Sequence, residues 1–198
     1  DANCFALSEA VDGAGKDYQS IFGIIIGTGF GGALSYKKEI IEGSNQIAGD
    51  WGHQPLPYPT KEEQETMIDC PSMNCGRPLC AEQFMSGIGF KDRFNQKYNT
   101  DFSSEEIVQL DLDKDPRANL ELSLYEDRMA RLMAVMIGIF DPDAIILGGG
   151  MSNIDRFYLN IPNLIPKYTF SNKVKTKVLK NIHGDSSGVR GAAWLWDN

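Results

Sequence analysis

The sequence predicts an α/β fold in which an antiparallel strand meander is followed by alternating helices and strands. Three strand-like segments follow one another with short links between residues 20 and 42, and strands joined in this way pair antiparallel. Beyond residue 79 the apolar residues take a helical period, and strands then alternate with helices. No internal repeat or low-complexity linker divides residues 1–198, so we expect one α/β lobe.

The first half of the chain supplies the meander. Residues 2–12 carry apolar and small side chains that predict a short helix, and Ser20–Ile26 is a β-branched run typical of a strand. A glycine-rich segment follows, after which residues 33–37 and 39–42 predict two further strands. Residues 57–77 are polar and contain three of the nine prolines, which indicates a long excursion from the core.

The second half is mainly helical. Ser103 is placed to cap one helix, with Glu106 as its capping-box partner. The longest helix should stop at Asp141-Pro142, because proline cannot continue it. We expect helices at residues 79–90, 105–110, 116–140, 154–168 and 188–196, and strands at residues 144–147 and 174–182.

The charge balance excludes several classes of partner. The formal net charge is −8, whereas nucleic-acid and anionic-membrane surfaces need clustered Lys and Arg. The lysines between residues 173 and 180 alternate with apolar residues, which is typical of a half-exposed strand. No apolar run approaches the roughly 18 to 20 residues of a membrane span. We expect a soluble protein that binds neither nucleic acid nor membrane.

The start of the chain carries two expectations. It opens on Asp1 without a methionine, so we expect a truncated or processed chain whose upstream part is missing. It shows no signal peptide. A cytoplasmic location is therefore expected.

A glycine-rich segment joins the first two expected strands. Glycines without a Cβ let backbone N–H groups converge on an anion, and a threonine hydroxyl can add a hydrogen bond to a phosphoryl oxygen. The alternative is a hairpin that is rich in glycine only because it turns tightly. The candidate phosphate-binding residues are Gly27, Thr28, Gly29, Phe30, Gly31 and Gly32.

A second glycine run, Gly148, Gly149 and Gly150, ends a buried strand where open α/β sheets bind ligands. Three glycines there leave room for a flat ring to approach the backbone. Close packing between strand and helix is the alternative. Two glycine-lined strand ends in one lobe favour a nucleotide held between them.

One cluster has the character of a metal site. Cys70, Cys75 and Cys80 fall within eleven residues, and His53 lies upstream. Thiolates and an imidazole make a closed tetrahedral zinc site, and an acidic chain without a signal peptide suggests a reducing compartment where disulfides are rare. Incidental cysteines are the alternative. Cys4 stands alone in an apolar stretch and indicates a packed thiol.

Four carboxylates near glycines are candidates for acid–base work: Asp1, Asp50, Glu82 and Asp185. Surface carboxylates are the usual alternative. With 27 acidic residues in the chain, composition does not choose among them.

Together these residues resemble the ROK family of sugar kinases and regulators, and within it the bacterial fructokinases. The resemblance covers essentially the whole chain. It implies the C-terminal lobe of an actin-like ATPase (ribonuclease H-like) fold, with residues 50–82 as a zinc-bearing excursion at the sugar site. The matching segments are Asp1 to Ala10, Gly27-Thr28-Gly29, Asp50-Trp51-Gly52-His53, Cys75 to Glu82, Asp141 to Gly150 and, for the fructokinase branch, His183 to Trp196.

The resemblance implies a role for each motif. Asp1 would be the general base that accepts the proton of the attacking sugar hydroxyl. Residues 27–32 would hold the phosphates of ATP, while Mg²⁺ neutralises the developing charge. Asp50, His53 and Glu82 would hydrogen-bond the ring hydroxyls, and His53 would also ligate a structural zinc ion. We expect a homodimeric hexose kinase that prefers fructose, with mannose next.

Two departures and two alternatives accompany the resemblance. Asp50 replaces the family's glutamate, which shortens the sugar contact by one methylene. Met73 stands where the family has its first zinc cysteine, and we expect Cys70 to serve as the fourth ligand instead. An N-acetylhexosamine kinase would share every motif. A sugar-responsive transcriptional repressor is the alternative of another class, although the retained Asp1 argues against it.

Overall fold

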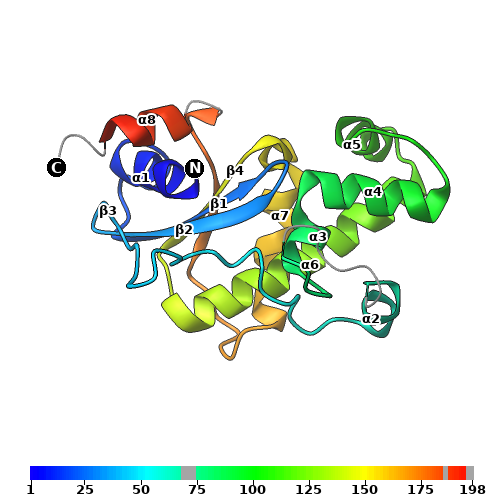
Figure 1. Ribbon diagram of the computed structural model, residues 1–198, viewed down its shortest axis with the longest axis horizontal. Coiled ribbons are helices and arrows are strands. Elements are labelled where there is room, and N and C mark those ends of the chain that lie inside the picture. The colour runs from blue at the N-terminus through cyan, green and yellow to red at the C-terminus, as the bar shows by residue number, and fades with distance from the viewer. Residues whose placement is uncertain (68–74, 185–186, 195–198) are drawn as a thin grey trace.

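The computed structural model describes residues 1–67, 75–184 and 187–194. A five-stranded sheet in the order β3-β2-β1-β4-β5 lies at the centre, with helices on both faces (Figure 1). The strands are β1 (Ser20–Ile26), β2 (Phe30–Tyr36), β3 (Glu39–Ile40), β4 (Ala144–Gly148) and β5 (Lys177–Lys180). The helices are α1 (Ala2–Val11), α2 (Lys61–Met67), α3 (Ala81–Met85), α4 (Gly87–Tyr98), α5 (Ser104–Leu112), α6 (Pro116–Phe140), α7 (Arg156–Leu164) and α8 (Ser187–Trp194), with 3-10 turns η1 (Gly150–Asn153) and η2 (Ile165–Lys167).

The first three strands form the expected meander. β1 pairs antiparallel with β2, and β2 pairs antiparallel with β3. β4 then adds parallel to β1, and β5 parallel to β4. The expected α/β fold is confirmed. Because β1 and β4 run in the same direction, their carboxyl ends, Ile26 and Gly148, lie at one edge of the sheet.

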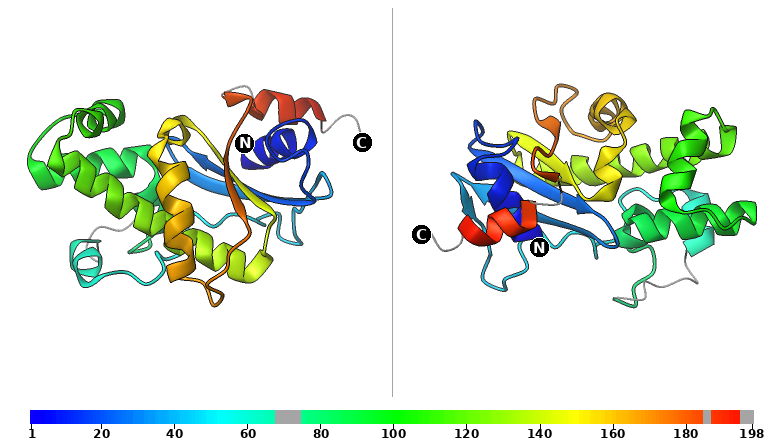
Figure 2. Two further views of the ribbon diagram at one scale, coloured as in Figure 1. Left: turned by 180° about the vertical axis from the view of Figure 1, so that it is seen from behind. Right: turned by 90° about the horizontal axis from the view of Figure 1, so that it is seen from above.

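The two faces of the sheet bury different side chains, because successive residues of a strand point to opposite faces. Phe22, Ile24 and Ile26 of β1 join the large core that includes α6 and α7. Ile21 instead packs with Phe5 of α1. Helices α1 and α8 pack together over that second face (Figure 2).

Local sequence signals set the ends of the helices. The predicted capping box is present, since the Ser103 hydroxyl accepts from Glu106 N–H at 3.1 Å and the Glu106 carboxylate accepts from Ser103 N–H at 2.7 Å. α6 begins after Asp115, whose carboxylate accepts from backbone N–H groups, and it ends at Asp141 in a left-handed conformation (φ 49°). None of the described helices is both long and apolar enough to cross a membrane.

Several expected elements differ from the structure. The strand expected at 33–37 begins earlier, at Phe30, and ends at Tyr36, and the strand expected at 39–42 ends at Ile40. The helix expected at 79–90 is divided into α3 and α4, because Ser86 between them has extended backbone and caps α4 with its hydroxyl. The helix expected at 154–168 is α7 followed by the tighter turn η2. The strand expected at 174–182 forms sheet hydrogen bonds over the shorter span of β5.

A buried ion cluster fixes α2, which lies within the expected excursion, to α6. The Glu63 carboxylate accepts from Arg128 Nε at 2.6 Å and Arg131 Nη2 at 2.8 Å, and all three side chains are at most 5% exposed. Burial alone would raise the pKa of Glu63, but hydrogen bonds from Arg131 and Thr60 N–H, with the charge of Arg128, lower it to about 2. The stabilisation by Glu63 is therefore present above its ordinary pKa of 4.5 and is lost as the pH falls through about 2.

Replacing Glu63 tests this cluster. Glu63→Gln leaves two buried guanidinium groups without their counter-charge, and we expect the free energy of unfolding to fall by about 3 to 5 kcal/mol. Glu65→Gln is the control on the same helix, where an exposed ion pair with Lys61 should be worth at most about 1 kcal/mol. Urea unfolding at neutral and acidic pH measures both. Two results would contradict the assignment. The two variants could lose the same free energy of unfolding, or Glu63→Gln could lose as much stability in acid as the wild type does.

Candidate nucleotide and sugar site

Three segments meet at the carboxyl edge of the sheet. Gly27 and Thr28 after β1, Gly150 after β4 and Gly87 at the start of α4 line one pocket of about 520 Å³. Gly87 N–H donates to the Gly27 carbonyl at 2.8 Å and so ties α4 to the β1–β2 hairpin. The two glycine runs therefore lie side by side. The volume is within the range of small-molecule sites.

The lining of this pocket combines apolar side chains with helix starts. Ser104 Oγ donates to the Gly87 carbonyl at 3.0 Å, which brings the first turn of α5 against that of α4. Free backbone N–H groups at helix starts favour anions, and an apolar wall suits a flat base. The apolar lining residues are Ile26, Ile88, Val108, Met151 and Ile154, and the polar ones beyond the glycines are Thr28, Ser104, Glu105 and Asn153.

The segment Gly27–Gly32 is a turn in its first half. Gly27 N–H donates to the Gly29 carbonyl at 3.0 Å, and Thr28 is exposed at the tip of the turn. A Cβ added at Gly27 would meet open space. The turn thus presents its backbone and the Thr28 side chain outward, as a phosphate-binding turn requires.

The second half of that segment, Phe30, Gly31 and Gly32, belongs to β2. The Phe30 ring is buried with its centroid 5.1 Å from that of Trp51. A Cβ at Gly32 would come within 2.5 Å of the Phe22 ring, so packing requires this glycine. Gly31 has open space around its Cα. These residues can contribute backbone groups, but the reason for Gly32 is steric.

The glycines of the second run also differ in their surroundings. A Cβ at Gly148 would come within 2.4 Å of the Phe5 ring, and one at Gly149 within 2.4 Å of the Ile26 carbonyl oxygen. Gly149 has φ 80° and ψ 172°, a conformation that is essentially confined to glycine. A Cβ added at Gly150 would meet no atom within 4 Å, and this residue lines the pocket. Close packing therefore explains two of the three glycines.

Asp1 precedes α1 at the same edge of the sheet. Phe5, one turn into the helix, packs on Gly148 at the end of β4 and donates its N–H to the Asp1 carbonyl at 2.9 Å. At the other end of the helix, the Val11 carbonyl accepts from Lys38, beyond β2. α1 therefore starts near the glycine runs. Asp1 itself is exposed.

The predicted sugar-binding residues gather at the start of β2. The Glu82 carboxylate accepts from Phe30 N–H at 3.4 Å, and Glu82 N–H donates to the Gly52 carbonyl at 2.8 Å. Gly52 packs so closely on the Phe30 carbonyl that a Cβ would come within 1.9 Å of its oxygen. His53 follows Gly52 directly, and Asp50 lies two residues before it. Glu82 thus contacts the first residue of β2, and the segment that carries Asp50 and His53 packs beside the same residue through Gly52.

His53, Cys75 and Cys80 form the expected metal-type cluster, with ligand atoms all within 4.8 Å of one another. His53 Nδ1 lies 3.7 Å from Cys80 Sγ, and the two thiol sulfurs are 3.6 Å apart. Tetrahedral zinc would set such atoms about 3.5 to 3.8 Å apart, whereas a disulfide needs about 2.0 Å. The donor set therefore fits zinc. Cys70, the expected fourth ligand, lies outside the described residues.

The contribution of α4 and α5 to the pocket at the carboxyl edge of the sheet was not predicted from the sequence. Gly87 and Ser104 each directly follow a serine N-cap, Ser86 and Ser103. These caps mark helix starts in the sequence, but nothing local shows that both starts meet the end of β1. The candidate Asp185 lies outside the described residues.

Comparison with known proteins gives one consistent result. The family model described as "ROK family" matches residues 1–198. The N-acetyl-D-glucosamine kinase of Vibrio atlanticus (strain LGP32) is 37% identical over 198 residues, covering 98% of this chain and 65% of the relative. The chain thus spans slightly less than two thirds of that protein's length.

Solved structures share the fold at lower identity. The ROK hexokinase from Thermus thermophilus superposes with a TM-score of 0.84 at 21% identity, covering 100% of this chain and 65% of that one. A ROK family glucokinase from Streptomyces griseus, in complex with glucose and AMPPNP, superposes with a TM-score of 0.83 at 23% identity, covering 98% of this chain and 65% of that one. The actin-like ATPase fold is thereby shown.

Two glycines of the second run provide a matched test. Gly149→Ala forces a methyl group toward the Ile26 carbonyl in a backbone conformation that costs about 1 to 3 kcal/mol, so we expect a loss at least that large. Gly150→Ala adds the same methyl group in open space and should change stability by less than about 1 kcal/mol. Chemical denaturation measures both. If both variants lost a similar free energy of unfolding, the close contact between Gly149 and the Ile26 carbonyl would not be what requires glycine there.

Proposed function

Because this chain belongs to the ROK family, we propose that it is the nucleotide- and sugar-binding lobe of an ATP-dependent hexose kinase. One observation carries the proposal. The β1–β2 hairpin lines the pocket with Gly27 and Thr28, and two residues further on its Phe30 N–H donates to the Glu82 carboxylate. A phosphate held at the hairpin would therefore lie between a base-binding pocket and a carboxylate suited to sugar hydroxyls.

The nucleotide would occupy the pocket with its base against the apolar wall. Gly150 leaves the backbone open to a flat ring, and Gly27, Thr28 and Gly29 would direct backbone and hydroxyl groups at the phosphates. Mg²⁺, when bound, would neutralise the charge that develops on the transferred group. The first turn of α5, at Ser104, would add further N–H groups beside the pocket, whereas the Gly87 N–H already donates to the Gly27 carbonyl.

The sugar would lie on the other side of the hairpin. Glu82, Asp50 and His53 would accept or donate hydrogen bonds to its hydroxyls. Asp1, at the same edge, would take the proton of the attacking hydroxyl while that oxygen bonds to the γ-phosphorus and the bond to the ADP oxygen breaks. A homodimer and a cytoplasmic location stay predictions.

We place N-acetylglucosamine first among the substrates. The support is the name of the relative reported above, which is 37% identical over nearly the whole chain. Fructose, the preferred substrate expected from the sequence, has no comparable support. The shorter Asp50 also leaves more room at the sugar than a glutamate would, which suits a larger substituent.

A sugar panel with an active-site variant tests the proposal. We expect the full-length protein to phosphorylate N-acetylglucosamine with a higher kcat/KM than fructose, mannose or glucose. Asp1→Asn should lower kcat by about a hundredfold to ten-thousandfold with little change in sugar binding. Asp17→Asn, in the exposed turn after α1, is the control and should behave as wild type. Sugar binding without turnover on any hexose would instead favour a sugar-responsive regulator.

Metal analysis tests the zinc proposal separately. Wild-type protein purified without added chelator should hold stoichiometric zinc by mass spectrometry, and Cys75→Ser and Cys80→Ser should lose it because serine is a poor zinc ligand. Cys70→Ser should weaken retention if that thiol is the fourth ligand. Cys4→Ser, in α1 and far in sequence from the cluster, is the control. Zinc retained in all three variants of the cluster would refute the site.

A further inference from the structure

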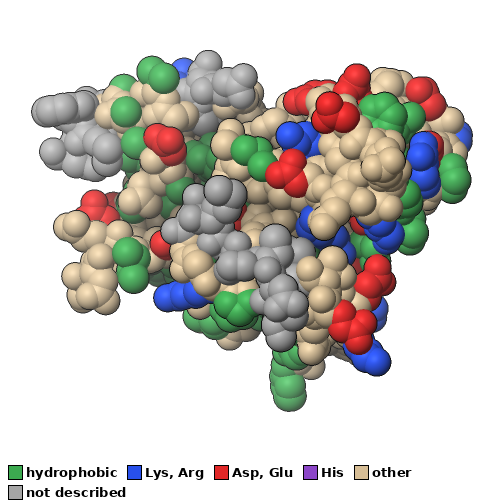
Figure 3. All heavy atoms as spheres, turned by 45° about the vertical axis from the view of Figure 1, so that its right-hand side comes forward, with side chains coloured by type: hydrophobic (Ala, Val, Ile, Leu, Met, Phe, Trp, Pro, Cys, Tyr) green, Lys and Arg blue, Asp and Glu red, His purple; other side chains and the backbone are tan. Residues whose placement is uncertain are grey.

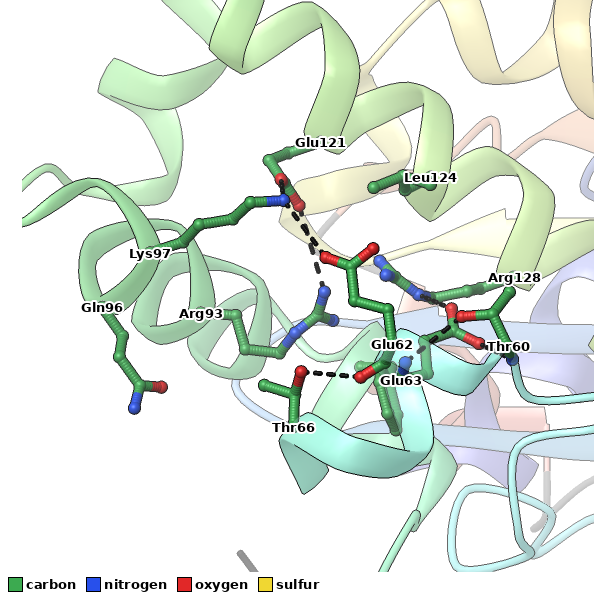
Figure 4. Close-up of a pocket in the computed structure, with 11 residues that line it drawn as sticks. Thr60, Glu62, Glu63, Thr66, Arg93, Gln96, Lys97, Glu121, Leu124 and Arg128 are labelled. Carbon is green, nitrogen blue, oxygen red and sulfur yellow. Dashed lines mark hydrogen bonds and ion pairs between the residues drawn. The ribbon is translucent and has the colours of Figure 1, made fainter. Parts of the chain in front are cut away.

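A second pocket lies between α2, α4 and α6 (Figure 4). Its volume is about 300 Å³, and it shares no lining residue with the nucleotide pocket. Phe84 and Leu124 supply apolar walls. On the surface around α2 and α4, basic and acidic side chains are interspersed (Figure 3).

Arg93 of α4 is the unusual group in this pocket. Its side chain is only 18% exposed, and its nearest counter-charge, Glu121, is 4.0 Å away. The guanidinium is stacked 4.8 Å from the centre of the Phe84 ring, and it donates no hydrogen bond to any described residue. Burial, together with the charge of Arg128, lowers the pKa of Arg93 to about 10. A largely desolvated guanidinium with open donors attracts an oxyanion, which can accept two parallel N–H bonds.

The other cations at the pocket already have close partners. Arg128 donates to Glu63 at 2.6 Å, and Lys97 donates to Glu121 at 2.8 Å. Figure 4 shows Lys97 and Arg93 reaching toward the same carboxylate from one face of α4. Arg93 is therefore the cation available to a ligand among the described residues that line the pocket.

The carboxylates restrict the ligand. Glu62 stands at the open side, with its side chain 75% exposed, and Glu121 lies buried. Both pair with the Lys97 ammonium, at 3.6 and 2.8 Å, so they lie on one side of the pocket and would repel a dianion such as phosphate. They would accept hydrogen bonds from hydroxyl or ammonium groups. Glu63, the third carboxylate in the lining, is already paired with Arg128 and Arg131. The pocket therefore combines the Arg93 guanidinium, which donates no hydrogen bond to a described residue, with two carboxylate acceptors.

We propose that this pocket binds a small monocarboxylate that also carries hydroxyl or ammonium groups, with its carboxylate on Arg93 and its donors toward Glu62 and Glu121. The class includes amino acids and short hydroxy acids, both of which fit the volume. The bound ligand would bridge α2 to α4. Phe84, in the pocket wall, belongs to α3, the same short helix that carries Glu82, so occupancy would also brace the element beside the hairpin.

Calorimetric titration of the full-length protein tests the site. L-serine and D-glycerate represent the two sources of the ligand chemistry, and inorganic phosphate represents a dianion. We expect binding of L-serine or D-glycerate at millimolar concentration and at least tenfold weaker binding of phosphate. Arg93→Gln should weaken carboxylate binding by about tenfold or more, the effect of losing a hydrogen bond to a charged group. Lys91→Gln removes a charge from the same helix outside the pocket, and its affinity for the carboxylates should stay within twofold of that of the wild type.

A second variant keeps the test independent of folding. Glu62→Gln changes an exposed side chain, so the fold should persist, and phosphate binding should strengthen when one carboxylate is removed. Tighter binding of L-serine identifies the donor as ammonium, and tighter binding of D-glycerate identifies it as hydroxyl. Three results would overturn the proposal. They are that neither L-serine nor D-glycerate binds, that phosphate binds more tightly than both of these carboxylates, or that Arg93→Gln and Lys91→Gln weaken carboxylate binding equally. None of these readouts depends on sugar phosphorylation.

Discussion

The site depends on a backbone contact that only glycine permits. β4 ends beside β1, and Gly149 lies so close to the Ile26 carbonyl that any side chain would collide with it. This contact sets where Gly150 opens and where the hairpin after β1 begins. Gly87 N–H then fixes α4 to the hairpin through the Gly27 carbonyl. The position of the pocket is therefore set by main-chain contacts, while apolar side chains form its wall.

The short helix α3 transmits constraints between the site and the rest of the molecule. Cys80 directly precedes α3 and lies in the metal-type cluster with His53. Glu82, in the first turn of α3, accepts a hydrogen bond from the hairpin. Phe84 packs against the guanidinium groups of Arg93 and Arg128. Five residues are too few for a stable isolated helix. Its position is held instead from both ends, by the cluster at Cys80 and by the packing of Phe84.

Sequence patterns predicted the parts of the fold that depend on local signals. The Ser103–Glu106 capping box, the span of α6 and the strand meander all follow from such signals, and each is confirmed. The division at Ser86 was missed because an apolar helical period continues across it. The role of Gly32 was also hidden, since a glycine selected for contact with Phe22 looks the same in sequence as one selected for phosphate. Such contacts join residues distant in the chain.

The two proposed sites would bind anions in different ways on one acidic chain. Among the described residues, no Lys or Arg lines the nucleotide pocket, so the charge of a nucleotide there would be met by backbone N–H groups, helix starts and a divalent cation. Net charge is a poor guide to such a site, because peptide dipoles carry no formal charge. The proposed Arg93 site would instead use one guanidinium, whose attraction for an anion is stronger in a buried pocket than in water because the local dielectric constant is lower. A net charge of −8 thus opposes binding to extended polyanions but is compatible with sites for small anions, since each requires only local groups that are fixed in direction and shielded from water.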